Sequence, residues 1–231
     1  MEFQLSATAD PRETAAYRKW RDKYAAEEDR CRRYEPTRRR EWLRRLSGRL
    51  DARMVLRALG DLPLGSPVLD LPCGGGRLSR ALRARGLRSV AADYSSFMLR
   101  ESEGSAASRV RADALRLPFR EGAFEAVVCF RFMQAVPRAL RIETLSELGR
   151  VGRLVVVSYA NVYSLRGLRR FLLGRTLPRN RLTEAQVTSE VAAAGLAVVG
   201  FHYKTRLLYE DFVAVARRPV GEAAGSALRS R

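Results

Sequence analysis

The stretch VLDLPCGGGRL, residues 68–78, decides the fold of this 231-residue chain. An apolar segment that reads as a buried strand runs directly into three consecutive glycines, and a helix-forming segment follows. Glycines at a strand–helix turn let the backbone bend tightly and approach a ligand with no Cβ in the way. The start of the helix adds free N–H groups. By itself such a turn predicts only a polar ligand, because many α/β proteins bind phosphate there.

Acidic residues near the ends of successive strands narrow the choice of ligand. Asp70 precedes the glycines, where a carboxylate would repel a pyrophosphate but suits a cofactor that carries an ammonium and a sulfonium. Asp93 ends the next apolar segment, 17 residues beyond Gly76. That is close to the spacing at which α/β cofactor domains place an acid on ribose hydroxyls. The alternative is that Asp93 caps a helix starting at Ser95.

Asp113 follows a third apolar segment, and its alternative is a turn residue. Ligands of open α/β sheets bind in the crevice at the carboxyl ends of the strands. Three acids at three successive strand ends therefore predict one shared binding crevice.

Outward from this stretch the chain alternates strands and helices, which predicts a parallel sheet covered on both faces. Strands are expected at 67–71, 88–93, 108–112, 124–130 and 153–159, with helices at 76–85, 96–103 and 138–149. After a longer connection at 160–182, a helix at 183–194 leads to two strands, 197–204 and 208–216, that are expected to pair antiparallel. The predicted fold is a three-layer αβα sandwich, with a Rossmann-like, seven-stranded, mostly parallel sheet and an antiparallel last strand.

Two helices, at about 12–33 and 37–59, are expected to precede the sheet, with Gly60 ending the second. Residues 1–60 would form a helical cap, 61–218 the cofactor-binding domain and 219–231 a flexible tail.

Three segments together resemble the successive motifs of the class I S-adenosylmethionine (SAM)-dependent methyltransferases. They are VLDLPCGGGRL at 68–78, VAADYSSFML at 90–99 and RADALRLPFREGAFEAVVCF at 111–130. The resemblance covers about residues 67–160, and the final helix and two strands also fit. It implies SAM as the cofactor.

The resemblance also implies a role for each matching residue. Gly74 and Gly76 would line the methionine part of SAM, with Asp70 near its amino group; Pro72 and Cys73 belong to the same turn.

On the adenosine side, Asp93 would take the ribose hydroxyls and Tyr94 would lie against the adenine. Asp113 would meet the adenine amino group and the backbone N–H of Ala114 a ring nitrogen, while Phe130 would pack against the cofactor.

The acceptor side is less defined. Methyl transfer is an in-line displacement from an activated sulfonium, so alignment is the main task and a general base is optional. Many relatives carry a His after the fourth strand, but this chain has only His202, which we expect to be structural. The weak catalytic candidates are Arg131, Gln134 and Tyr159. Arg131 would pair with the cofactor carboxylate or an anionic substrate, or else be an ordinary solvated side chain. Tyr159 and Asn161 are expected to face the crevice.

Composition bounds the partners. The formal charge is +18, and all but three of the 43 basic residues are Arg. The choice of Arg over Lys fits a GC-rich genome, but it does not explain the excess over 25 acids. This excess either favours anionic partners such as nucleic acid, anionic lipid or an acidic small molecule, or serves only general solubility. The three cysteines form no CxxC pair, so no metal site or disulfide framework is expected. We expect a cytoplasmic protein without a membrane span.

Three functions remain open. The favoured one is methylation of a small-molecule or lipid-like, anionic or neutral acceptor, achieved by positioning. The second is an RNA-directed methyltransferase that uses the Arg-rich segment at 38–49. The third is a non-catalytic SAM-binding module.

Overall fold

The computed structural model describes residues 38–162, 181–204 and 211–219 of the chain. The expected helix at 12–33, most of the connection at 160–182 and the tail from residue 220 onward lie outside these residues.

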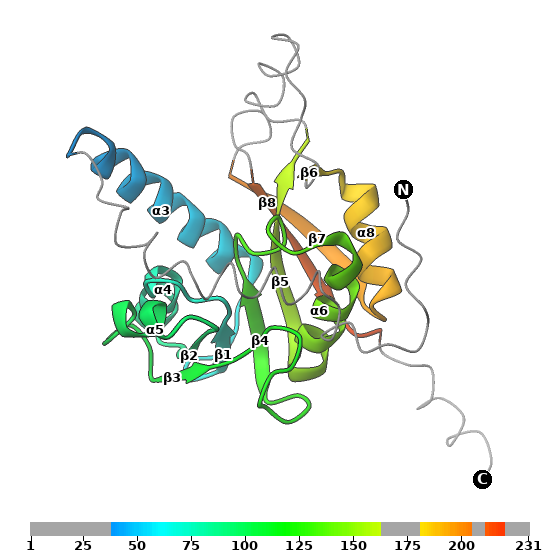
Figure 1. Ribbon diagram of the computed structural model, residues 1–231, viewed down its shortest axis with the longest axis horizontal. Helices are drawn as coiled ribbons and strands as arrows, with labels where there is room; N and C mark the ends of the chain where they lie inside the picture. Colours follow the sequence, from blue (N-terminus) through cyan, green and yellow to red (C-terminus); the bar gives the residue numbers. More distant parts are fainter. Residues whose placement is uncertain (1–37, 163–180, 205–210, 220–231) are drawn as a thin grey trace.

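A single mixed sheet forms the centre of the molecule (Figure 1). Its main path has the order β3-β2-β1-β4-β5-β8-β7. The strands are β1 (Pro67–Asp70), β2 (Arg88–Asp93), β3 (Ser108–Arg111), β4 (Phe124–Cys129), β5 (Gly152–Asn161), β6 (Arg181–Leu182), β7 (Ala197–Tyr203) and β8 (Asp211–Arg217). The first five are parallel, and β8 is antiparallel to both β5 and β7. The predicted Rossmann-like sheet is confirmed. The two-residue β6, which pairs with the end of β5, is an addition to the seven expected strands.

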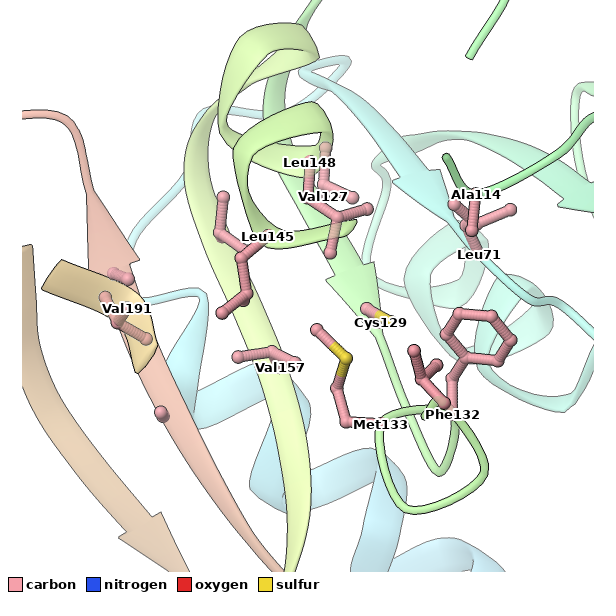
Figure 2. Packing of buried hydrophobic residues seen from close by; sticks show 14 of the residues in the cluster. Leu71, Ala114, Val127, Cys129, Phe132, Met133, Leu145, Leu148, Val157 and Val191 are labelled. Carbon is pink, nitrogen blue, oxygen red and sulfur yellow. The ribbon is translucent and has the colours of Figure 1, made fainter. Parts of the chain in front are cut away.

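Helices cover both faces of this sheet. They are α3 (Arg38–Ala58), α4 (Arg77–Ala84), α5 (Ser96–Glu101), α6 (Arg138–Val151) and α8 (Glu184–Ala193). On one face α3 and α4 bury a cluster that includes Val55, Leu82 and Val128. On the other, Leu145 and Leu148 of α6 approach Val127 and Val157 of the sheet (Figure 2). These positions agree with the predicted helices to within a few residues.

Helix α3 joins the expected cap to the core. Its buried residues Asp51, Val55 and Ala58 recur at helical spacing and face the sheet, and the helix ends where Gly60 takes a φ of +62°. Its first turns project beyond the sheet (Figure 1). The second half of α3 is thus part of the helical layer on this face of the sheet.

The alternation of side chains along β1 determines which face of the sheet Asp70 points to. Val68 packs in the cluster under α3 and α4, while Leu69 packs in the cluster under α6. Because successive side chains of a strand point to opposite faces, Asp70 faces α4.

Candidate active site

The glycine turn borders open space on one side and packed protein on the other. Gly74 and Gly76 have φ of +50° and +72°, which side chains rarely adopt. A Cβ on Gly76 would lie 2.2 Å from Ser105 Oγ, so this glycine lets the turn pack against the segment after α5. A Cβ on Gly74 or Gly75 would meet no atom within 4 Å. These two residues can therefore receive a ligand against the backbone.

Asp93 fixes the turn to the neighbouring strand. Its Oδ2 accepts the Gly74 N–H at 3.0 Å and its Oδ1 accepts the Ser95 N–H at 2.9 Å, and the Cys73 N–H donates to Ala92 O at 2.8 Å. Burial raises the pKa of Asp93, while the N–H donors act in the opposite direction. The side chain that caps α5 is Ser95, which accepts the Met98 N–H. Each Asp93 oxygen has a further lone pair for a ligand hydroxyl.

Asp70 is the most deeply buried of the three acids, with 1% of its surface exposed. Its Oδ2 accepts the Ser79 hydroxyl at 2.6 Å. Burial raises its pKa to about 7. A carboxyl group with this pKa exists in both forms near neutrality, so a cation placed beside it would draw it into the ionised form.

Asp93 ends β2, and Asp113 follows the adjacent strand β3. The Ala112 N–H donates to Asp93 O at 3.1 Å, and Asp113 Oδ1 accepts the Leu115 N–H at 3.0 Å. The Arg111 guanidinium lies 5.4 Å from the centroid of the Tyr94 ring. Arg111 thus covers one face of the ring that is predicted to lie against adenine.

Beyond β4 the chain turns sharply at Arg131, whose φ is +59°. Its backbone N–H donates to Ser158 Oγ at 2.6 Å, and its guanidinium lies over the ring of Phe130 at 5.5 Å. Nε pairs with Asp211 at 3.0 Å and Nη2 with Asp51 at 3.3 Å. Arg131 is thus held by three parts of the protein, while 42% of its side chain is exposed. Its pairing with the cofactor carboxylate or an anionic substrate stays a prediction.

Asp51 is a residue that the sequence reasoning missed. It is fully buried on α3, and its carboxylate pairs with Arg77 at 3.0 Å, with Arg131, and with the ammonium of Lys204. Burial lowers the pKa of Lys204. One signal was present in the sequence, because Asp51 is the only acid between Glu41 and Asp61 in an Arg-rich segment.

The other acceptor-side candidates are buried or half-buried. Tyr159 is 1% exposed and stacks on Phe212 at 6.0 Å. It lies in the core cluster under α6 and α8, behind the strand ends, because alternation along β5 points it that way. Its hydroxyl has no hydrogen-bond partner among the described residues, and burial raises its pKa. Asn161 is buried at the end of β5, and Gln134 is half-buried in the loop after β4.

Comparison with known proteins supports a methyltransferase domain. A family model described as a methyltransferase domain matches residues 68–153, which span β1 to the start of β5 and carry all three acids. The match covers 86 of the 231 residues, and over them the chain is similar to SAM-dependent methyltransferases.

Curated relatives match only part of the chain. Two demethylmenaquinone methyltransferases are 39% identical over 118 residues (Beutenbergia cavernae, 48% of either chain) and 38% identical over 112 residues (Thermobifida fusca, 42% of this chain and 45% of the relative). The chain thus spans about half the length of the curated relatives it matches.

Solved structures share the fold over most of the chain. Magnesium protoporphyrin IX methyltransferase from Synechocystis PCC 6803, with bound SAH, has a TM-score of 0.64 at 21% identity, over 86% of this chain and 98% of that one. A TehB-like SAM-dependent methyltransferase from Corynebacterium glutamicum has a TM-score of 0.59 at 16% identity, over 85% and 100%.

SAM is the cofactor of this family, and the site fits it. Open space lies in front of Gly74 and Gly75, and Asp93 has remaining acceptor capacity beside it. Burial raises the pKa of Cys73 to about 12, so this thiol stays protonated at neutral pH. Within the described ranges, no group of three or more His, Cys, Asp or Glu side chains is arranged to hold a metal.

Proposed function

We propose that this methyltransferase transfers the methyl group of SAM to a small, lipid-like acceptor of the quinone type. The methyl-transfer part rests on the hydrogen bond from the Gly74 N–H to Asp93, which lies beside the open space in front of the glycine turn. It also rests on the match of residues 68–153 to a methyltransferase domain. The acceptor class rests on the likeness to demethylmenaquinone methyltransferases.

Bound SAM supplies a methyl group that is already activated by the sulfonium. The residues of the chain are then needed to hold and orient the reactants. Asp93 would hold the ribose, the Gly74–Gly75 backbone would cradle the methionine part and Asp70 would lie near its ammonium. Asp113, Ala114 and Tyr94 would border the adenine, with Phe130 packed on the cofactor.

The loop after β4 supports an apolar acceptor and a reaction without a dedicated base. Residues 130–137, FRFMQAVP, contain no His, Asp or Glu. Phe132, Met133 and Val136 are buried there, and Met133 lies beside Cys129 and Val157 (Figure 2). The polar side chains of this loop, Arg131 and Gln134, are the remaining candidates for contact with acceptor oxygens. An acceptor that ionises readily, as a quinol does, requires only alignment.

The outer face of α3 supports contact with an anionic lipid surface, in which such an acceptor would dissolve. Arg49, Arg53 and Arg57 are exposed at four-residue spacing, and Leu46 on the same face is 47% exposed. No helix within the described ranges is long and apolar enough to cross a membrane. RNA would draw on the same arginines, so it is the alternative partner of this face.

The test begins with calorimetric titration of SAM into the full chain, where saturable one-to-one binding is expected. Turnover is then followed by mass spectrometry with a short-chain demethylmenaquinone, reduced to the quinol, which should gain one methyl group. Absence of SAM binding would remove the enzyme proposal, and SAM binding without methylation would remove only this acceptor class. Sedimentation with anionic vesicles, set beside a gel shift with RNA, separates the two partners of α3.

A further inference from the structure

Charge is distributed unevenly between the helices on the two faces of the sheet. Helices α3 and α4 together contain eleven Arg and two acids, whereas α6 and α8 contain three Arg and four Glu. Asp51, one of the two acids of α3, is buried and pairs with Arg77. A positive charge that served only solubility would have no reason to gather on one face. The asymmetry points to an anionic partner of α3 and α4.

Helices α3 and α4 form one continuous layer. The first residue of α4, Arg77, reaches Asp51 in the middle of α3 at 3.0 Å. Directly after α4, Arg85 donates from Nη1 to Leu56 O at 2.7 Å and from Nη2 to Gly60 O. The start and the end of α4 are thus both fastened to α3, so the outer sides of the two helices face the same solvent.

The outer side of this layer, which we call the α3–α4 face, presents five exposed arginines. They are Arg49, Arg53 and Arg57 of α3, and Arg80 and Arg83 of α4. The three of α3 follow one another about 6 Å apart, since four residues span this rise along a helix. None of the five forms an ion pair within the described residues. Arg80 and Arg83 each donate one hydrogen bond to a backbone oxygen, which leaves further donors for a phosphate.

Two exposed leucines border the α3–α4 face. Leu46 lies on the outer side of α3 and is 47% exposed. Leu64 is 81% exposed and lies against the turn after α4, where a Cβ on Gly86 would come within 2.8 Å of Leu64 Cδ2. Arginines with exposed leucines beside them suit an anionic lipid interface, which offers phosphates and an apolar boundary together.

The same face lacks the side chains with which proteins grip single-stranded nucleic acid. Bases stack on aromatic rings, but residues 46–60 and 77–88 contain no Phe, Tyr or Trp. Contact with a phosphate backbone would also leave Leu46 and Leu64 without a role. The combination of charge and apolar surface therefore favours lipid over RNA.

We propose that the α3–α4 face binds the surface of an anionic lipid bilayer. Its arginines would donate to headgroup phosphates, and Leu46 and Leu64 would enter the boundary between headgroups and acyl chains. Asp51 pairs with Arg131 just beyond the end of β4, so the turns of α3 before Asp51 project past the carboxyl edge of the sheet (Figure 1). Binding through this face would bring the crevice at that edge beside the bilayer.

The inference rests on the proposed function for its purpose, which is the supply of an acceptor dissolved in the bilayer. It extends the lipid contact from α3 to a face that includes α4.

The first experiment sediments the full chain with vesicles in the absence of SAM and acceptor. Binding is expected to vesicles that mix phosphatidylglycerol with phosphatidylcholine, and not to phosphatidylcholine alone, and it should weaken as salt is added. Equal or absent binding to the two kinds of vesicle would overturn the proposal. Because no SAM is present, this outcome is independent of the SAM titration that tests the proposed function.

Two paired variants test the two helices separately. Arg49→Gln with Arg53→Gln changes α3, and Arg80→Gln with Arg83→Gln changes α4. An arginine near an anionic surface contributes about fivefold to binding, so each pair should weaken vesicle binding by about tenfold or more. Thermal unfolding shows that each variant is folded. Unchanged binding in the α4 pair would overturn the inclusion of α4 in the face.

The matched control removes two charges from the other side of the sheet. Arg138 is exposed at the start of α6, and Arg153 is 71% exposed on β5, where alternation places it on the same side as Val155 and Val157. Arg138→Gln with Arg153→Gln should weaken vesicle binding by less than about threefold, because both lie far from the bilayer. Equal weakening by all three pairs would show an effect of net charge alone and overturn the proposal.

Leu46→Ser with Leu64→Ser separates lipid from RNA. Loss of the two apolar side chains should weaken vesicle binding by about fivefold or more and leave the binding of an RNA hairpin unchanged. Unchanged vesicle binding would contradict the place of these leucines in the bilayer. If the unaltered chain bound the hairpin more tightly than anionic vesicles at the same salt, and both arginine pairs weakened that binding, the lipid proposal would be overturned in favour of RNA.

Discussion

The two faces of the sheet each bury an ionic group, and the two groups differ in exposure to solvent. Under α6 and α8, the Arg141 side chain is 3% exposed and its Nη1 pairs with Glu190, which is 12% exposed, at 3.1 Å. Its Nε also donates to Val136 O at 3.3 Å, so the pair fastens α8 to the loop after β4. Under α3, the buried Asp51 pairs with Lys204, Arg77 and Arg131, and the Arg77 and Arg131 side chains are 45% and 42% exposed.

This difference separates an ion pair that is closed to solvent from one that a ligand can reach. A sealed pair offers no group to a ligand, whereas two half-exposed guanidinium groups near the glycine turn can still meet an anion. We therefore expect the α6 and α8 side to hold the loop after β4 in shape, and the α3 and α4 side to meet the cofactor. Four changes test this division, from the largest expected effect to the smallest.

Glu190→Ala should have the largest effect on stability. It removes the carboxylate from the buried Arg141, and breaking a buried pair in this way costs about 3 kcal/mol or more. Denaturant unfolding should show the loss, while SAM affinity of the folded fraction stays unchanged. A loss of SAM affinity without a loss of stability would place this pair on the cofactor side and break the comparison.

Asp93→Ala should weaken SAM binding by about 1–3 kcal/mol, the cost of leaving hydrogen-bonding groups without a partner. The Gly74 and Ser95 N–H groups both lose their acceptor. Calorimetric titration measures the effect, and Asp93→Asn, which keeps one acceptor oxygen, should fall between. Unchanged affinity would remove Asp93 from the ribose site.

Asp70 should make SAM binding depend on pH. Its pKa is 3.8 in the unfolded chain and about 7 in the folded one, so between these values the folded state keeps a proton that the unfolded chain has lost. Stability therefore falls as pH rises through this window. An ammonium beside Asp70 favours its ionised form, so SAM affinity should rise by up to about tenfold per pH unit towards pH 7 and then level off. Asp70→Asn should flatten the part of the profile due to this carboxyl; an identical profile would contradict the assignment.

His202→Ala should have the smallest effect. Burial, and then the charge of Arg57, lower the pKa of His202, so the ring is neutral at pH 7. It lies on β7, outside both ionic groups. Stability should change by no more than about 0.5 kcal/mol, and methylation of the short-chain quinol should persist. A loss of turnover by orders of magnitude in a folded variant would identify His202 as the missing base.

Local patterns were sufficient for most of the fold. The strand–glycine–helix stretch and the alternation after it predicted β1 to β5 and the antiparallel pair β7–β8, because hydrophobic period and glycine placement are local. The two-residue β6 could not be predicted from the sequence, because so short a strand exists only through its pairing with Ala160 and Asn161. For Tyr159, the position at a strand end suggested the crevice, but the face of the sheet decided its burial.

The sequence by itself predicted the cofactor side of the site. Its residues can be recognised in the sequence because each stands at a fixed offset from a strand end. They are Asp70, Asp93, Asp113 and the glycines that follow Asp70. Only the tertiary structure decided the group of ion pairs around Asp51, whose members come from positions 51, 77, 131, 204 and 211. No local period links residues so far apart. Their interaction follows from the crossing of α3 over the sheet, where burial makes an ion pair out of residues that in the sequence look like ordinary surface charge.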